Sequence, residues 1–330
     1  MRTDPPSAST PVEVSPLRDE LADVLGLLDS AERAGVPLVD EAERARLDAL
    51  EAGADAAGWY RWVAHRDDEL VGYLGILLPE TGQAEREHDA AHPGGQPASP
   101  DQDPALALGD LAVPRGRRAD PAVLLALLAR AADVAERADC TVELWLRDAE
   151  ETDVETVTSS EVPVTVQRRL GVLGRDLTEA PSSVPGPTIR SYRPGEDDAA
   201  VVEVLAAAYA GTDDGGWDLP TFRERRRFGW FDPADLLLAV DDADRPFGLH
   251  WLKRRDAATG EVYNLAVHPR AQGAGAGPTL LAAGLRHLHA TGCREVLLWV
   301  DLANERAVQL YRRQGFETRW VDVALRLDRG

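Results

Sequence analysis

Hydrophobic and polar residues follow two different periods along the second half of the chain. Leu280, Leu281, Gly284, Leu285 and Leu288 recur at steps of three and four, which predicts a helix with one apolar face. The run "EVLLWV" that comes soon after it is short and continuously apolar, which is typical of a strand covered on both sides. Because the connection from helix to strand is short, we expect a mixed sheet with helices packed on its faces.

The chain carries this succession of segments twice. Strand-like runs joined by a polar turn, "WYRWVAHRDDELVGYLGIL" and "DLLLAVDDADRPFGLHWLK", precede "ALGDLAVPRGRR" and "EVYNLAVHPRAQ", and each copy continues into an apolar helix and a strand. "QRRLGV" in the first copy resembles "YRRQGF" in the second. Two copies of one α/β domain are the simplest interpretation. We expect an N-terminal domain over residues 1–180 and a C-terminal domain over 181–330, joined by the proline-rich segment Thr178–Thr188.

Composition is that of a globular protein, because 44% of the 330 residues are hydrophobic. No run reaches the ~18 apolar residues of a membrane span and the first residues lack an apolar signal segment, so we expect a cytoplasmic location. Cys140 and Cys293 precede strand-like runs, which favours two reduced core thiols over a disulfide. Thr81–Pro104 is rich in Gly, Pro, Gln and charge and predicts a long flexible loop.

The formal charge of -21 limits the partners that the chain attracts. It disfavours nucleic acids and anionic membranes and tolerates a cationic substrate, although an acidic surface that keeps the protein soluble is the simpler explanation. Lys253 is the sole lysine among 36 basic residues, which marks it as a candidate for a specific role. The seven histidines form no pattern of metal ligands, and we expect His268, which precedes a proline, to be structural.

A glycine-rich turn joins the strand-like run "EVYNLAV" to the predicted helix. Gln272, Gly275 and Gly277 fit the pattern Gln/Arg-x-x-Gly-x-Gly/Ala, and Pro278 suits the first turn of a helix. Glycines let the backbone approach a ligand, and the amides and dipole of a helix start favour an anion such as a pyrophosphate. A tight connection without a ligand is the alternative. The turn lacks the Gly-Lys-Ser/Thr ending of a nucleotide-kinase loop.

A second helix with recognisable ends follows in "DLANERAVQLYRRQGF". Asn304 is a good N-cap, and Asn304, Ala307, Val308 and Tyr311 fall on one face of the helix. Gly315 stands where a left-handed residue would end it.

Together, "VHPRAQGAGAG" and "NERAVQLYRRQGF" resemble the acetyl-CoA site of the Gcn5-related N-acetyltransferases, the GNAT family. The resemblance implies that the strand before the glycine turn holds the pantetheine arm, the turn holds the pyrophosphate, and the second helix lines the arm from the other side. The implied cofactor-binding residues are Leu265, Ala266 and Val267, then Gln272, Gly273, Ala274, Gly275, Ala276, Gly277 and Pro278, and then Asn304, Glu305, Arg306, Ala307, Val308 and Gln309.

By the same resemblance Tyr311 lies near the thioester sulfur. A phenol of ordinary pKa about 10 can protonate a departing thiolate, whereas plain packing is the alternative role. The first copy has "VPRGRRADP" where the second has its glycine turn, and Gln167 where the second has Tyr311. We therefore expect the N-terminal domain to be catalytically degenerate, whether it binds acetyl-CoA loosely or serves as a wall for the substrate.

The tandem arrangement resembles one branch of that family, the mycothiol synthases, in "RPGEDDAAVVEVLAAAYA", "FGWFDPADLLLAVDD", "FGLHWLK" and "GEVYNLAV". The resemblance implies a monomeric enzyme that acetylates the cysteinyl amine of a cysteinyl-glucosaminyl-inositol, desacetylmycothiol, without a metal or a covalent enzyme intermediate. Acetylation of another small amine, or a non-catalytic CoA-binding sensor, are the alternatives.

Five positions of the chain correspond to substrate contacts by this resemblance. Glu261 would bind the incoming ammonium and draw off its proton, unless it is an exposed strand-end carboxylate. Lys253 would reach the substrate's hydroxyls, and Glu41 would contribute from the first domain. Trp299 stands where the family usually has tyrosine, and Asp213 replaces a glutamate in the altered segment "GTDDGGW". These departures lie near the expected acceptor pocket, so the acceptor can differ while binding of acetyl-CoA is retained.

Overall fold

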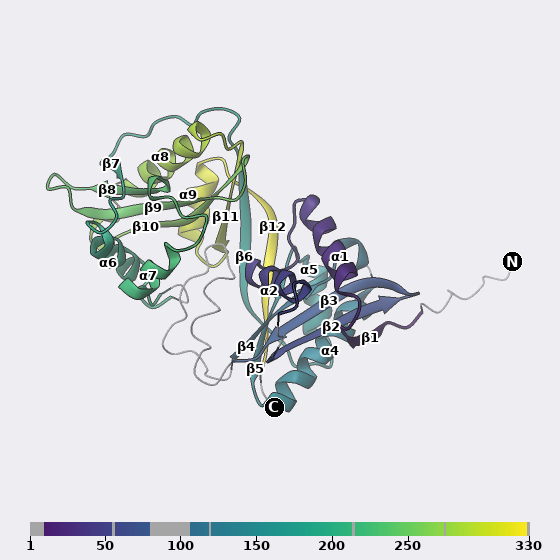
Figure 1. Ribbon diagram of the computed structural model, residues 1–330. Helices are drawn as coiled ribbons and strands as arrows, with labels where there is room; N and C mark the ends of the chain where they lie inside the picture. Colours follow the sequence, from purple (N-terminus) through teal and green to yellow (C-terminus); the bar gives the residue numbers. More distant parts are fainter. Residues whose placement is uncertain are drawn as a thin grey trace. The chain divides into compact units, whose positions relative to one another are not determined.

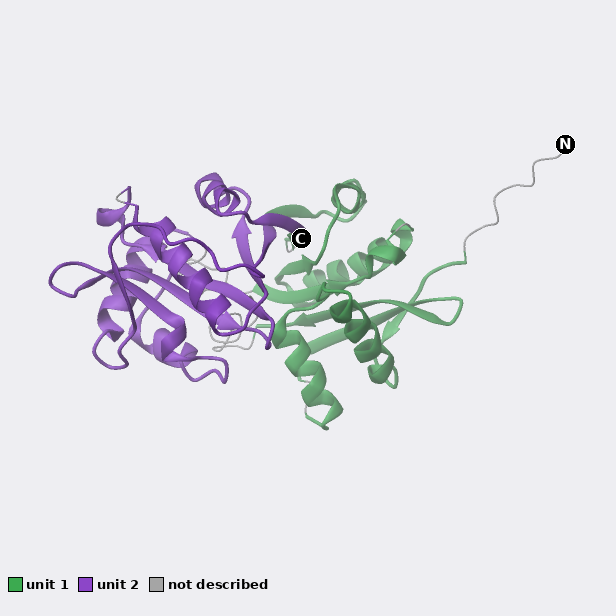
Figure 2. Cartoon of the chain, turned by 90° about the horizontal axis from the view of Figure 1, so that it is seen from above, with its two compact units in different colours: residues 1–84, 103–169, 321–330 green, residues 85–102, 170–320 purple. Residues whose placement is uncertain are grey.

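The protein is described by a computed structural model over residues 10–54, 57–79, 106–118, 120–212, 215–273 and 275–328. Figure 1 labels its helices and strands, and Figure 2 distinguishes two compact units. Residues 1–84, 103–169 and 321–330 belong to the first unit, and residues 85–102 and 170–320 to the second. Each unit is a mixed α/β structure, as predicted. The domain boundaries 1–180 and 181–330 stay a prediction, and the expected loop 81–104 lies outside the described residues.

The strands of the first unit follow the order β1-β2-β3-β4-β5-β12. The pair β4–β5 is parallel and the other pairs whose register is known are antiparallel. Its elements are β1 (Glu13–Pro16), α1 (Leu21–Arg33), α2 (Glu41–Glu51), β2 (Trp59–Arg66), β3 (Glu69–Leu77), β4 (Leu106–Ala112), η2 (Arg115–Arg117), α4 (Pro121–Ala138), β5 (Thr141–Leu146), α5 (Glu151–Thr158) and the second part of β12 (Glu317–Leu327).

Helices cover this sheet on both faces. Leu124, Leu127 and Leu128 of α4 are fully buried against strands β3 to β5, whereas α1 and α2 pack on residues such as Val63 and Tyr73. Burying a leucine side chain contributes roughly 1.5–3 kcal/mol, so the two clusters supply most of the driving force for this unit.

The second unit continues the same plan in the order β6-β11-β10-β9-β8-β7. The pair β10–β11 is parallel and the others are antiparallel. Its elements are the second part of β6 (Thr165–Asp176), β7 (Thr188–Ser191), α6 (Asp198–Ala208), α7 (Leu219–Arg225), η3 (Pro233–Asp235), β8 (Leu236–Val240), β9 (Pro246–Arg254), β10 (Thr259–Val267), η4 (Pro269–Ala271), α8 (Ala276–Ala290), β11 (Glu295–Asp301) and α9 (Glu305–Arg313).

The predicted apolar helix is α8, and "EVLLWV" forms most of β11. Leu281, Leu285 and Leu288 of α8 are buried on one face of the sheet, while α6 and α7 cover the other. Gly284 has a more specific role than the sequence suggested. A Cβ there would lie 2.1 Å from Nδ1 of His250, so this glycine makes room for a buried imidazole.

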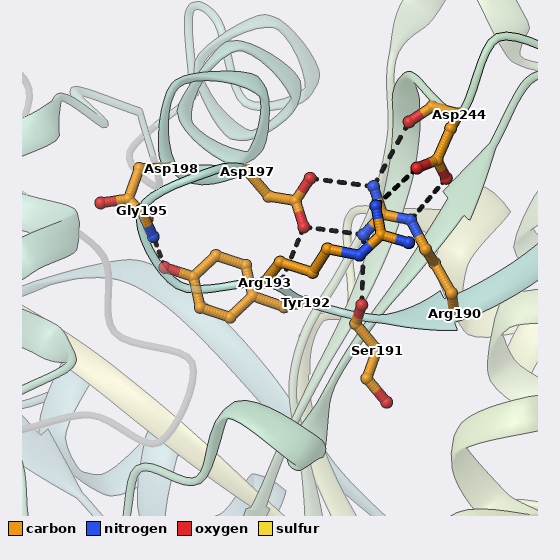
Figure 3. A network of polar contacts seen from close by, with 8 residues as sticks. All are labelled: Arg190, Ser191, Tyr192, Arg193, Gly195, Asp197, Asp198 and Asp244. Carbon is orange, nitrogen blue, oxygen red and sulfur yellow. Dashed lines mark hydrogen bonds and ion pairs between the residues drawn. The ribbon is translucent and has the colours of Figure 1, made fainter.

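Ion pairs connect the edge strand β7 with the start of α6 and with the β8–β9 turn (Figure 3). Arg190 donates to both carboxylate oxygens of Asp197 at 2.7 and 2.9 Å and to Asp244 at 2.6 Å, and Arg193 also contacts Asp244 at 2.6 Å. Bidentate pairs of this kind combine charge with fixed geometry. The network therefore locates the start of α6 relative to the β8–β9 turn.

Residues 178–188, expected as a linker, belong to the second unit and lie along α8. The hydroxyl of Thr279 donates to the carbonyl of Pro185 at 3.1 Å, and a Cβ at Gly186 would lie 2.1 Å from the Thr279 oxygen. Cys140 and Cys293 are both buried and are not joined in a disulfide, as predicted. Among the described residues, no helix combines the length and apolar character needed to cross a membrane.

Candidate active site

The site begins where β10 and β11 part. Their parallel pairing covers Thr259–Glu261 against Glu295–Leu297, whereas β10 continues beside β9 as far as Val267 opposite Gly248. The register between β10 and β9 shifts at Tyr263, so the strand bends at this point. In the described part of the chain, β11 thus does not pair with β10 beyond Glu261. The main-chain N–H and C=O groups on that side of β10 can form hydrogen bonds with a bound ligand, because backbone donors and acceptors need partners.

The three residues expected to hold the pantetheine arm lie in this parted half of β10. Leu265 and Val267 are partly exposed and Ala266 is buried. An extended strand with one free edge can pair with an extended chain that carries amides, which is the chemistry of a pantetheine arm.

The glycine turn follows directly and leads into α8. Gly273 and Gly275 have φ angles of 88° and 81°, a left-handed conformation that side chains disfavour. Gly275 occupies the N-cap of α8, and no side chain caps the helix. The amides at this helix start are therefore suited to an anion. A Cβ at Gly277 would lie 3.9 Å from Leu310 of α9, and Ala274 lies outside the described residues.

Gln272 connects the turn to its neighbours. Its amide nitrogen donates to the carbonyl of Val267 at 3.2 Å, and its amide oxygen accepts from Arg306 at 2.9 Å. Arg306 is exposed in the first turn of α9, so a positive charge stands beside the helix start of α8. The structure thus brings together two predicted cofactor-binding residues that are 34 positions apart.

The ends of α9 are as predicted. The side chain of Asn304 accepts from the amide of Ala307 at 3.1 Å, and Gly315 has a φ of 80° just after the helix. Tyr311 is 8% exposed and its ring meets that of Phe316 edge-on at 5.6 Å. Burial raises the pKa of the Tyr311 phenol, so it stays protonated at neutral pH. The residue is both a packing residue and a proton-carrying hydroxyl.

Glu261 and Lys253 stand directly opposite each other on β10 and β9. Residues in such a pair project to the same face of a sheet. Glu261 is fully buried, so the alternative of an exposed strand-end carboxylate is wrong. Lys253 is 5% exposed, and its ammonium lies 5.3 Å from the ring centre of Trp230. The sole lysine of the chain is therefore a buried residue beside the predicted base.

Sequence reasoning missed Arg255, which contacts two of the predicted residues. Its Nη1 donates to Oε2 of Glu261 at 2.9 Å, and its guanidinium lies 5.4 Å from the ring centre of Trp299. Trp299 in turn meets Trp320 edge-on at 6.5 Å. In a chain that uses arginine almost everywhere, no local signal distinguishes this position.

An aromatic cluster beside Lys253 was also missed. Trp230 packs on Tyr263 at 4.8 Å, and Trp251 contacts both of them. Asn264 of β10 accepts a hydrogen bond from the Tyr209 hydroxyl at 3.2 Å. Aromatic rings with polar edges suit the apolar faces and hydroxyls of a carbohydrate.

Two predicted substrate residues are not placed in this group. Glu41 is an exposed residue in the first turn of α2 in the first unit, and Asp213 lies outside the described residues. His268 accepts from the amide of Arg270 at 3.1 Å and so begins η4, in line with the predicted structural role. Within the described ranges, no group of three or more His, Cys, Asp or Glu residues could hold a metal ion.

Comparison with known proteins agrees with this geometry. Residues 201–316 match the model of the acetyltransferase (GNAT) family. The mycothiol acetyltransferase of Stackebrandtia nassauensis is 35% identical over 311 residues, which cover 91% of this chain and 92% of that protein. The mycothiol acetyltransferase of Actinosynnema mirum is 45% identical over 157 residues, 46% of this chain and 52% of its own length, so this match spans about half of that relative.

Two solved structures share the fold over nearly the whole chain. A GCN5-related N-acetyltransferase from Sphaerobacter thermophilus matches with a TM-score of 0.64 and 20% identity, covering 96% of this chain and 95% of its own. A tandem GNAT protein of the clavulanic acid biosynthesis pathway matches with a TM-score of 0.60 and 19% identity, covering 97% and 99%. With the full-length relative at 35% identity, these findings show that the chain is an N-acetyltransferase and belongs to the mycothiol acetyltransferases of the GNAT family.

Proposed function

We propose that this protein transfers the acetyl group of acetyl-CoA to the cysteinyl amine of desacetylmycothiol, a cysteinyl-glucosaminyl-inositol. The observation that carries the proposal is the buried Glu261, paired across the strands with Lys253, at the point where β10 and β11 part. The relatives named mycothiol acetyltransferase support the choice of acceptor.

The second unit has the features that acetyl-CoA requires. The parted half of β10, Leu265 to Val267, suits the pantetheine arm, and the uncapped start of α8 suits the pyrophosphate. Arg306, held by Gln272, adds a positive charge, and Asn304 to Gln309 would line the arm. Acetyl-CoA supplies an acetyl group activated as a thioester. The protein must then orient an amine toward that carbonyl, accept a proton from the amine and supply a proton to the leaving thiolate.

Glu261 would accept the proton of the amine, and Tyr311 would donate to the thiolate. An α-amino group of pKa about 8 is mostly cationic at neutral pH, and a buried carboxylate attracts it and accepts its proton, directly or through water. The amine nitrogen then bonds to the acetyl carbon, the carbon–sulfur bond breaks, and the sulfur leaves as a thiolate. The protonated Tyr311 phenol donates a hydrogen bond or its proton to that thiolate.

Lys253 and the aromatic residues around it would receive the sugar and inositol. A buried ammonium over an indole ring can donate to hydroxyls while the rings contact carbohydrate carbons. Trp299, Glu41 and Asp213 stay predicted contributors to this site. A monomer in the cytoplasm is the expected state of the protein.

The test is acetylation by the purified protein with acetyl-CoA, read as product mass because the acceptor carries its own thiol. Desacetylmycothiol is compared with an aminoglycoside, a polyamine and a peptide N-terminus. We expect selective acetylation of desacetylmycothiol, with kcat reduced about 100-fold in Glu261→Gln and less in Tyr311→Phe. Acetylation of a different amine alone would contradict the acceptor and leave the chemistry intact. Binding of acetyl-CoA without any product would favour a sensor.

A further inference from the structure

We propose that Arg255 is a positioning residue for Glu261: it holds the carboxylate in place as an anion, ready to receive the substrate ammonium. The inference rests on the proposed function, in which Glu261 accepts the amine proton. It adds a residue that neither the glycine-turn motif nor the acceptor resemblance singles out.

The contact itself is a charge-assisted hydrogen bond. Nη1 of Arg255 lies 2.9 Å from Oε2 of Glu261, and Glu261 is fully buried whereas the arginine side chain is 21% exposed. A buried carboxylate interacts with a neighbouring cation much more strongly than an exposed one does, because water screens it less. The arginine therefore favours the ionised form of this carboxylate and restricts its rotation.

Arg255 is in turn held in place from several sides. Its amide donates to the carbonyl of Thr259 at 3.0 Å, which closes the β9–β10 turn. The carboxylate of Asp256 accepts from the amides of Ala258 and Thr259 at 2.7 and 2.8 Å and makes that turn rigid. The Trp299 ring, 5.4 Å from the guanidinium, supplies a further attraction. The guanidinium thus has a fixed place between a carboxylate and an indole.

Other charged groups on these strands have contacts of their own. Lys253, opposite Glu261 on β9, lies over Trp230. On β11, Glu295 pairs with Arg319 of β12 at 3.1 Å, and Leu297, opposite Glu261, is uncharged. Arg255, in the turn between β9 and β10, forms an ion pair with Glu261 at 2.9 Å.

This arrangement has a consequence for the reaction. An arginine partner makes a carboxylate a weaker base and keeps it ionised, so that it attracts an ammonium. Without it, protonation of Glu261 would occur at higher pH, and the enzyme would lose activity earlier as the solution is acidified.

The experiment measures kcat/KM against pH, at saturating acetyl-CoA, for the acceptor that the wild-type protein acetylates. In Arg255→Met we expect kcat/KM to fall at least tenfold and the acidic limb of the profile to move up by about one pH unit. Arg255→Lys, which keeps the charge but not the fork, should restore part of both. Arg245→Met, an exposed turn arginine paired with Asp241, is the matched control and should change neither.

Affinity for acetyl-CoA and the thermal unfolding midpoint separate this role from a folding defect. Both should stay close to wild type in Arg255→Lys, because the glycine turn lies at the other end of β10. An active wild type with an unshifted Arg255→Met profile would overturn the positioning role alone. A wild type that acetylates no amine would overturn the proposed function and this inference with it.

Discussion

The start of α4 in the first unit and the start of α8 in the second are capped differently. Both helices follow a strand and a short 3₁₀ turn. At α4, the carboxylate of Asp120 accepts from the amide of Ala122 at 2.9 Å and pairs with Arg66 at 2.5 Å. The Ala122 hydrogen bond and Arg66 together hold the pKa of Asp120 below its usual value, so a negative charge already occupies this helix start. At α8, Gly275 provides no side-chain cap, and we propose that the amides there bind an external anion.

The sheets beside these helices differ in the same sense. Strands β4 and β5 stay paired from Leu106 to Asp110, whereas β10 and β11 part after Glu261. The neighbouring strand on the other side also differs between the units. Asp110 of β4 lies opposite Gly75 of β3, whereas Asn264 of β10 lies opposite Trp251 of β9. The same order of elements thus forms a parallel strand pair that stays together in the first unit and one that separates in the second.

In the first unit, Glu43 of α2 fills the space that Gly75 leaves. A Cβ at Gly75 would lie 1.8 Å from Oε1 of Glu43, and this buried carboxylate accepts from Tyr73 at 2.6 Å, Trp59 at 3.2 Å and Arg46 at 2.9 Å. A buried carboxylate is costly unless it accepts hydrogen bonds, and these three donors supply them. The first unit therefore has a network of charged and aromatic side chains in the centre of its sheet.

The largest effect should come from breaking this network. Glu43→Ala leaves the Tyr73 hydroxyl, the Trp59 N–H and Arg46 without their buried acceptor, so we expect a loss of about 3–5 kcal/mol in the free energy of unfolding. Urea unfolding followed by circular dichroism measures it. Glu51→Ala, at the exposed end of the same helix, should change stability by less than about 0.5 kcal/mol. Equal losses in the two variants would refute the buried network.

The second effect tests the two helix starts. Gly275→Asp adds to α8 the negative charge that α4 already has, at a left-handed position that disfavours side chains. We expect the Kd for acetyl-CoA, measured by calorimetry, to rise about 100-fold through repulsion of the phosphates.

The reciprocal variant sharpens the comparison. Asp120→Gly removes the cap of α4 but leaves β4 and β5 paired, so we expect a stability loss of a few tenths of a kcal/mol and no gain in acetyl-CoA binding. A second molecule of acetyl-CoA bound by this variant would show that the cap alone closes the first unit.

The last comparison concerns one buried aspartate in each unit. Burial raises the pKa of Asp235, but hydrogen bonds from His287 and Arg254 outweigh it and leave the pKa lowered. Burial and the charge of Asp40 raise the pKa of Asp110 well above its usual value.

These opposite shifts predict opposite pH dependence. A lowered pKa contributes stability that is present above the unfolded pKa of about 4 and is lost as pH falls through the folded pKa. A raised pKa means that the ionised carboxylate of Asp110 destabilises the folded state. Protonation of this carboxylate as the pH falls toward 4 therefore removes that destabilisation of the first unit. Asp235→Asn should thus cost about 1–2 kcal/mol at pH 7 and less at pH 3, whereas Asp110→Asn should be neutral or stabilising at pH 7. Denaturant titrations at both pH values check the signs, and equal signs would contradict the assignment.

The sequence alone determined the local structure of the second unit. The spacing of Leu281, Leu285 and Leu288 predicted α8, Asn304 and Gly315 predicted the ends of α9, and the glycine pattern predicted the turn that leads into α8. These features depend on neighbours within a few positions, where backbone sterics, capping and helical period act directly.

Tertiary structure decided which side chains share a site. The register of β9 and β10 puts Lys253 opposite Glu261, the β9–β10 turn aims Arg255 at that carboxylate, and the packing of α2 buries Glu43 against Gly75. Each of these contacts joins residues on different elements, and a strand shifted by one residue would turn each side chain to the other face. The composition of a segment does not encode that register; the packing of the whole sheet does.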